Sequence, residues 1–163
     1  MTTTATGPAG VTIRRATRAD LLAVHRIEKR SFPQPWPYHA FEGFLSEPGF
    51  LVADDASVVG YLVADTVENH GAAIGHVKDI AVEPDRRGEG IGSRLLERTL
   101  GTLATRGVAD VKLEVRGSNE AARSLYRRFG FEHHHTVPGY YDDGEDALVM
   151  VTDLAEAPSL RSR

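Results

Sequence analysis

The stretch from Asp79 to Leu96 constrains the fold most, because a strand, a glycine turn and a helix follow one another in it without interruption. Ile80 and Val82 favour a strand, which Pro84 ends because proline cannot donate to a strand ladder. Three glycines then occur at every second position: Gly88, Gly90 and Gly92. An apolar stripe of helical spacing begins directly behind them. The stretch predicts a helix N-terminus with outward-pointing backbone N–H groups, which is a natural phosphate site.

The spacing of these glycines excludes two common phosphate motifs. A P-loop requires a lysine after the last glycine, and a dinucleotide motif requires Gly-x-Gly-x-x-Gly. The segment Arg87-Gly88-Glu89-Gly90-Ile91-Gly92 instead resembles the Gln/Arg-x-x-Gly-x-Gly/Ala motif of the GNAT acetyltransferase family. This resemblance implies that the backbone of residues 88–93, ending at Ser93, wraps the pyrophosphate of acetyl-CoA. On the residues alone, a glycine-rich connection without a ligand is the alternative.

Composition restricts the remaining possibilities. A chain of 163 residues suits one domain, which we predict over residues 11–154, between a disordered leader (1–10) and a flexible tail (155–163). The net charge of −4 argues against a general nucleic-acid binder. The absence of cysteine excludes disulfides, thiolate catalysis and cysteine-based zinc sites, and it fits a cytoplasmic protein. No apolar run reaches the ~20 residues of a membrane span.

Hydrophobic periodicity and turn residues predict the order of the elements. Strands are expected at 11–15, 50–53, 58–67, 72–82, 111–115, 131–137 and 147–154. Helices are expected at 17–30, 38–46, 91–105 and about 119–129. Gly60 is a candidate close-packing site and Gly75 a candidate β-bulge. This order predicts an α/β fold with a mixed, mostly antiparallel sheet of about seven strands flanked by four helices, and it matches the GNAT fold over residues 11–154.

A second block, Leu113–Tyr126, resembles the Leu-Glu-Val-Arg-x-Ser-Asn-x-x-Ala-x-x-Leu-Tyr signature of N-terminal acetyltransferases. The similarity is greatest to the ribosomal-protein-alanine (RimI) type and its archaeal relatives. It implies that Glu114 is a general base, that Tyr126 is a general acid at the cofactor, and that Asn119 contacts CoA. The alternatives are structural: Glu114 paired with a neighbouring cation, a core tyrosine with a bonded hydroxyl, and an asparagine helix cap.

Three further segments complete the site that the resemblance implies. The backbone of Ile80, Ala81 and Val82 would pair with the pantetheine arm, and the Val82 N–H would be an oxyanion-type donor. A rigid loop with Phe32, Pro35 and Trp36 would form one wall of a peptide slot, and Tyr140 and Tyr141 the other. The alternatives are a plain buried strand for the first segment and an inward-packed Trp36 for the second.

The expected reaction is direct acetyl transfer from acetyl-CoA to a protein or peptide N-terminus, such as that of a ribosomal protein. A free α-amine titrates near pH ~7.7–8.0 and a lysine side chain near ~10.4, so the α-amine is more readily neutral. The rival interpretations are a GNAT enzyme for a small-molecule amine or a lysine, and a non-catalytic acyl-CoA-binding module. We expect a monomer or weak dimer without nucleic-acid or membrane partners. Strand alternation argues against a metal site at His133, His134 and His135, and no metal is expected.

Overall fold

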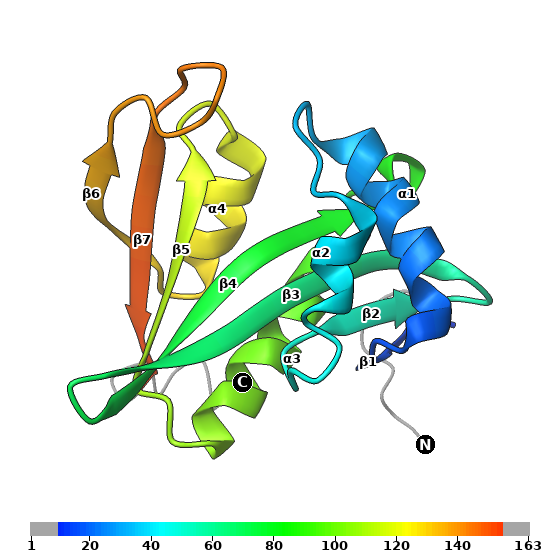
Figure 1. Ribbon diagram of the computed structural model, residues 1–163, viewed down its shortest axis with the longest axis horizontal. Helices are drawn as coiled ribbons and strands as arrows, with labels where there is room; N and C mark the ends of the chain where they lie inside the picture. The colour runs from blue at the N-terminus through cyan, green and yellow to red at the C-terminus, as the bar shows by residue number, and fades with distance from the viewer. Residues whose placement is uncertain (1–9, 155–163) are drawn as a thin grey trace. The chain divides into compact units, whose positions relative to one another are not determined.

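The computed structural model describes residues 10–154. Figure 1 shows the course of the chain through these residues. The strands are β1 (Thr12–Arg15), β2 (Leu51–Asp54), β3 (Val58–Asn69), β4 (Ala72–Val82), β5 (Asp110–Arg116), β6 (Glu132–Val137) and β7 (Ala147–Asp153). The α-helices are α1 (Leu21–Ser31), α2 (Tyr38–Glu42), α3 (Ile91–Thr105) and α4 (Glu120–Arg128), and single 3-10 turns span Arg18–Asp20 and Pro84–Arg86.

Within the described residues, seven strands form one sheet in the order β1-β2-β3-β4-β5-β7-β6. β4 and β5 are parallel, whereas β1 with β2, β2 with β3, β5 with β7, and β6 with β7 pair antiparallel. A parallel pair needs a crossover connection, and the segment containing α3 provides it. The predicted mixed, mostly antiparallel sheet of seven strands with four helices is confirmed.

The chain divides into two compact units. The first unit comprises the described residues up to Asp65 together with Asp79–Thr102. The second unit comprises Thr66–Lys78 together with the described residues from Leu103 onward. Both β3 and β4 contribute residues to each unit.

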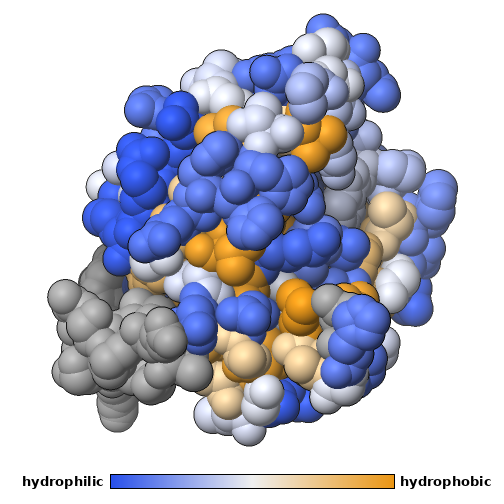
Figure 2. All heavy atoms as spheres, turned by 90° about the vertical axis from the view of Figure 1, so that its left-hand side faces the viewer, coloured by the Kyte–Doolittle hydropathy of each residue, from blue (hydrophilic) through white to orange (hydrophobic). Residues whose placement is uncertain are grey.

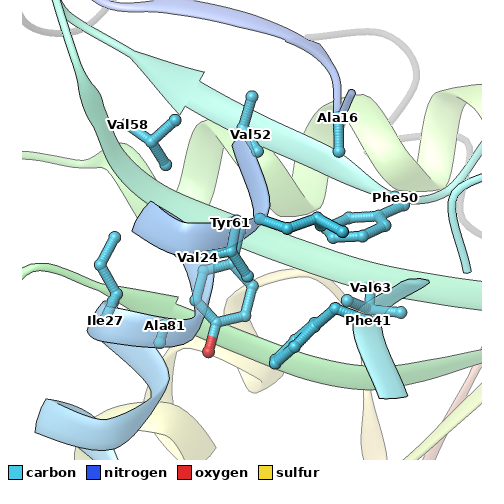
Figure 3. Close-up of a cluster of buried hydrophobic side chains, with 11 residues drawn as sticks. Ala16, Val24, Ile27, Phe41, Phe50, Val52, Val58, Tyr61, Val63 and Ala81 are labelled. Atoms are coloured by element: carbon cyan, nitrogen blue, oxygen red, sulfur yellow. The ribbon is translucent and has the colours of Figure 1, made fainter. Parts of the chain in front are cut away.

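The first unit has its apolar core between α1, α2 and one face of β2 and β3 (Figure 3). Tyr61 of β3 lies in this cluster and is fully buried. Its neighbour Gly60 points to the opposite face, where an added Cβ would lie 3.1 Å from the Ala81 carbonyl and 3.4 Å from Ile91 Cγ2 of α3. Helices therefore cover both faces of this part of the sheet, and the prediction that Gly60 permits close packing is confirmed.

The ends of the first two helices differ from the sequence-based prediction. The helix expected from residue 17 begins as a 3-10 turn, in which the Asp20 carboxylate accepts hydrogen bonds from the Thr17 N–H (2.8 Å) and hydroxyl (3.1 Å). Arg14 also donates to this carboxylate, at 2.8 and 2.9 Å. α2 ends at Glu42 rather than at residue 46, because the chain continues in turns closed by i→i+3 hydrogen bonds such as Phe44 N–H to Phe41 O.

In the second unit, apolar side chains approach closely at Gly75, the predicted position of a bulge. β4 and β5 pair in a regular register from Ile74 opposite Asp110 to Val77 opposite Leu113. A Cβ at position 75 would instead lie only 2.8 Å from Leu103 Cδ1 and 3.2 Å from Val111 Cγ2. The glycine therefore leaves room for these apolar side chains, and the β4–β5 pairing is regular there, while a bulge toward β3 stays a prediction.

Strand β6 lies at the edge of the sheet, and its residues from Glu132 to Thr136 are exposed. Figure 2 shows the left-hand side of Figure 1, where β6 lies. Hydrophilic residues predominate on this face, with hydrophobic residues between them. The register of β6 against β7 shifts between His133 and His135, so simple alternation of faces fails at this point. None of the helices in residues 10–154 is long and apolar enough to cross a membrane.

Candidate active site

The glycine segment of the first unit has the backbone conformation that its sequence predicts. Gly88 and Gly90 have φ angles of +82° and +84°, in the left-handed region that other residues rarely adopt, and a Cβ at either position would meet nothing within 4 Å. At the start of α3, the Arg94 N–H donates to the Gly90 carbonyl at 3.1 Å. The N–H groups of Ile91 and Gly92 therefore have no acceptor within the helix, which suits an anionic group.

The charged side chains of this segment are bound to other parts of the first unit. Arg87 donates to the Val82 carbonyl (3.0 Å) and to the Ser31 hydroxyl (3.2 Å). Glu89 pairs with Arg86 at 3.0 Å. The backbone of the glycines and of the helix N-terminus is therefore unobstructed, and it is the part of this segment that suits a pyrophosphate. Arg87 connects the segment to the end of β4.

The end of β4 is firmly held by its neighbours in the first unit. Ala81 belongs to the buried core. The Val82 carbonyl accepts from Arg87, and the next residue, Glu83, donates its N–H to the Val59 carbonyl at 2.8 Å. The Glu83 carboxylate also pairs with Arg30 of α1 at 2.9 Å. Residues 80–82 therefore have a fixed backbone, as a role in holding a pantetheine arm would require.

The segment between α1 and α2 contains the aromatic residues predicted for a peptide slot. Trp36 is partly buried, and its ring stacks on Phe44 with centroids 5.7 Å apart and contacts Phe41 at 5.2 Å. Phe32 is also partly buried against the core, whereas Pro35 is exposed. Trp36 thus packs inward against Phe41 and Phe44, which agrees with the structural alternative for this residue. Its contact with a peptide stays a prediction.

In the second unit, Glu114 of β5 forms a close pair with His76 of β4. Nε2 of His76 lies 2.7 Å from Oε1 of Glu114, and the two side chains are 16% and 18% exposed. Sequence reasoning missed His76. Alternation within β4 and β5 is the signal that could have found it, because buried Gly75 and Val77 flank His76 just as buried Leu113 and Val115 flank Glu114.

The surroundings of Glu114 keep it ionised at neutral pH. Partial burial acts to raise the pKa of this carboxyl, but the hydrogen bond with His76 and the nearby charges of His76, Lys112 and Lys78 outweigh it. The pKa of Glu114 consequently lies below its ordinary value. Glu114 is thus a carboxylate that can accept a proton from a reacting group, and His76 is its nearest partner.

The two predicted tyrosines lie next to each other in the β6–β7 loop, with ring centroids 5.0 Å apart. Burial and the negative charge of Glu114 raise the pKa of Tyr140, which is 51% exposed. Burial likewise raises the pKa of Tyr141 to about 12. Both hydroxyls therefore stay protonated at neutral pH and lie within the electrostatic reach of the Glu114 carboxylate.

Arg116 fixes this loop from the end of β5. Its guanidinium donates to Asp143 at 2.8 Å and to Glu145 at 2.9 Å, and it lies 4.1 Å from the centre of the Tyr141 ring. Glu145 also accepts from the Ser118 N–H at 2.8 Å. The loop is thus bound at several points to the segment that follows Glu114, which predicts a rigid wall in this unit.

The remaining predicted residues of the second unit have clear structural roles. Tyr126 is only 5% exposed, and its ring contacts Phe131 with centroids 5.8 Å apart. Asn119 accepts the Ala122 N–H through Oδ1 at 3.1 Å and caps α4. Tyr126 thus packs in the core through its ring and Asn119 is a helix cap, while a catalytic or cofactor role of either residue stays a prediction.

The three consecutive histidines of β6 pair through their backbone with β7, and their side chains form hydrogen bonds within their own strand. Nε2 of His133 lies 2.9 Å from the Thr136 hydroxyl, and the Nδ1 atoms of His134 and His135 lie 2.7 Å apart. Among residues 10–154, no group of three or more histidine, cysteine, aspartate or glutamate side chains is arranged to hold a metal ion.

Comparison with known proteins gives consistent matches. The family model described as "Acetyltransferase (GNAT) family" matches residues 21–131. The chain is 36% identical to an N-alpha-acetyltransferase of Sulfolobus acidocaldarius, over 87% of this chain and 92% of that protein. It is 32% identical to the [ribosomal protein bS18]-alanine N-acetyltransferase of Escherichia coli, over 88% of this chain and 98% of the relative.

A solved structure has the same fold. The crystal structure of Ard1 from Thermoplasma volcanium matches with a TM-score of 0.83 and 28% sequence identity. The match covers 89% of this chain and 98% of that protein. The predicted strand and helix order is therefore shared with a solved protein over most of its length.

Proposed function

Since the chain belongs to the GNAT acetyltransferase family and is an acetyl-CoA-dependent N-acetyltransferase of that type, we propose that its acceptor is the α-amine of a protein N-terminus. Relatives named for N-alpha and ribosomal-protein-alanine acetylation, which align with nearly the whole described chain, support this choice. We extend the proposal to ribosomal proteins as one acceptor class.

The observation that carries the proposal is the His76–Glu114 pair beside the tyrosine loop. An acyl-CoA-binding module has no need for an ionised, half-buried carboxylate held by a histidine at 2.7 Å. Such a group is suited to general base catalysis, because it can take a proton directly or through one water molecule. The neighbouring hydroxyls of Tyr140 and Tyr141 are hydrogen-bond donors and acceptors suited to a peptide backbone.

We assign the steps as follows. The neutral amine nitrogen attacks the acetyl carbonyl carbon, the carbonyl oxygen gains negative charge, and the attacking nitrogen becomes acidic. The Glu114 carboxylate takes the proton from that nitrogen, while His76 holds the carboxylate in place. The carbon–sulfur bond then breaks, and the leaving thiolate takes a proton from the Tyr126 hydroxyl. Glu114 releases its proton to solvent and Tyr126 regains one from solvent, which restores both side chains. The products are an amide and free CoA, and no covalent enzyme intermediate is formed.

The backbone of the first unit supplies the cofactor contacts in this proposal. The N–H groups at residues 88–93 hold the pyrophosphate, residues 80–82 hold the pantetheine arm, and the Val82 N–H stabilises the negative oxygen. An oxyanion-hole donor of this kind typically contributes ~10²–10³-fold to the rate. The thioester supplies the acetyl group, and the side chains of the protein move the protons.

The proposal is tested with a peptide panel and acetyl-CoA, with CoA release as the readout. One set carries a free N-terminus and no lysine, and the matched set carries a blocked N-terminus and one lysine. We expect far faster transfer to the free N-termini, because an amine of pKa ~8 is partly neutral at working pH and lysine is almost wholly charged.

Two results would contradict the proposal. Equal or faster transfer to the blocked lysine peptides would indicate a lysine acetyltransferase. CoA release with small amines but with no peptide would indicate a small-molecule enzyme. Glu114→Gln is the control in every series, since a rate that survives this substitution would not come from the proposed base.

A further inference from the structure

Three oxygen-bearing side chains meet inside the first unit, next to its apolar core. Glu28 of α1 is 2% exposed and Tyr61 of β3 is fully buried. Asp79 of β4 is partly buried, and its Oδ2 atom is shielded from solvent. Acidic residues are almost never this deeply buried unless their charge is compensated. The proposed chemistry uses none of these side chains, so their burial requires another explanation.

Hydrogen bonds compensate the Glu28 carboxylate. The Tyr61 hydroxyl donates to Oε1, and the Trp36 backbone N–H donates to Oε2 at 2.9 Å. Burial and the charges of Asp79 and Glu28 raise the pKa of Tyr61, so its hydroxyl remains a donor. Burial and the adjacent Glu28 carboxyl raise the pKa of Asp79 well above its ordinary value. The two oxygens of Glu28 are therefore each satisfied by a hydrogen bond inside the first unit.

Glu28 is bonded at both ends of the segment between α1 and α2. Its carbonyl accepts the Phe32 N–H at 3.1 Å, which is the last hydrogen bond of α1, and its carboxylate accepts the Trp36 N–H. Prolines at positions 33, 35 and 37 have no N–H to donate, so this segment has few backbone hydrogen bonds available to it. The Glu28 carboxylate is thus a main anchor of the Trp36 backbone, in addition to the packing of its ring on Phe41 and Phe44.

We propose that Glu28 is a positioning residue for the acceptor peptide: its buried carboxylate, which accepts the Trp36 N–H, fixes the segment Phe32–Trp36 in the conformation that receives the peptide. This inference rests on the proposed function, in which that segment forms part of the peptide slot. Glu28 does not touch the reacting atoms. Its loss therefore weakens peptide binding and leaves the chemical step of a bound peptide largely unchanged.

The test is Glu28→Gln, measured with a free-amine peptide and acetyl-CoA. The amide can offer its oxygen to only one of the two donors, and its NH₂ group then faces the other donor. We expect the KM for the peptide to rise roughly tenfold or more, while kcat and the acetyl-CoA Kd stay within about twofold, since a lost hydrogen bond to a charged group has about this effect. Because Trp36 is the single tryptophan of the chain, its fluorescence reports on the segment directly, and we expect a red-shifted emission.

Two matched variants separate positioning from general stability. Tyr61→Phe removes the other hydrogen bond of the carboxylate and leaves the bond to Trp36, so it should lower the thermal midpoint and keep KM and fluorescence unchanged. Asp79→Asn replaces the carboxyl by an amide of nearly the same shape and leaves the bond between Glu28 and Trp36 in place, so it should also keep KM. If Glu28→Gln does not fold, Glu28→Asp keeps the charge but withdraws it from Trp36, and it should raise KM in the same way.

The outcomes distinguish this inference from the proposed function. A normal peptide KM and unchanged Trp36 fluorescence in Glu28→Gln, beside normal wild-type transfer, would overturn the positioning role alone. An equal rise of KM in Tyr61→Phe would also overturn it, since that variant keeps the bond to Trp36. Failure of the wild type to acetylate any free-amine peptide would overturn both proposals.

Discussion

Replacing Tyr126 by phenylalanine tests whether this residue is a general acid or only a core tyrosine. Its ring is 5% exposed and contacts Phe131 at a centroid distance of 5.8 Å, and phenylalanine keeps that ring and its packing. The substitution therefore creates no cavity and removes one hydroxyl group. The two roles of that hydroxyl predict effects on different quantities.

The magnitudes separate the two roles clearly. A buried hydroxyl that makes an ordinary hydrogen bond contributes about 1 kcal/mol, which lowers Tm by roughly 2–4 °C in a chain of this size. A positioned general acid contributes ~10²–10⁴-fold to the rate, which corresponds to about 3–5 kcal/mol of transition-state stabilisation. We expect Tyr126→Phe to lose at least a hundredfold in rate, with no more than the small change in Tm.

The assay is a single-turnover measurement with pre-bound acetyl-CoA, made on the same preparation as a thermal melt. Tyr61→Phe is the control, because it removes another buried hydroxyl to which we assign no chemistry. It should lose stability and keep its single-turnover rate. A normal rate with a lowered midpoint in Tyr126→Phe would refute the general-acid assignment and leave Glu114 without its proposed partner.

Three further predictions concern the cofactor segment, the base and the tyrosine loop. Gly90→Glu should abolish acetyl-CoA binding in calorimetry without unfolding the protein, because it adds bulk and negative charge at the phosphate site. The control is Gly107→Glu, which introduces the same backbone strain at an equally open glycine with φ +83° and should bind acetyl-CoA normally. Glu114→Gln should lower kcat by ~10²-fold or more at every pH, with acetyl-CoA affinity unchanged. Because the pKa of Glu114 lies below its ordinary value, the rise of the rate toward pH 8 should follow the acceptor amine and persist in the variant. Loss of that rise would contradict the assignment. Arg116→Ala removes the ion pairs to the β6–β7 loop and should raise the peptide KM without changing acetyl-CoA affinity, and an unchanged KM would show that the loop does not need this anchor.

Local sequence patterns predicted the elements well, because each depends on residues close together in the chain. The glycines at 88 and 90 both take positive φ angles, and Asn119 caps α4 as a short polar residue before a helix should. Contacts from outside a segment do not show in such patterns. At Gly75, the side chains of Leu103 and Val111, which are distant in sequence, lie 2.8 and 3.2 Å from the position of an added Cβ.

The candidate site shows the same division between local pattern and tertiary contact. The sequence by itself determined the order of strands and helices, the glycine turn in front of α3, and Glu114 on the polar face of β5, because periodicity and backbone conformation are local properties. Only the tertiary structure paired Glu114 with His76, placed the Glu28 carboxylate against Tyr61 and the Trp36 backbone, and anchored the tyrosine loop on Arg116. Side chains 8 to 38 positions apart in the sequence form these contacts. Their hydrogen bonds and pKa values depend on burial and on neighbouring charges, which arise only when the chain has packed.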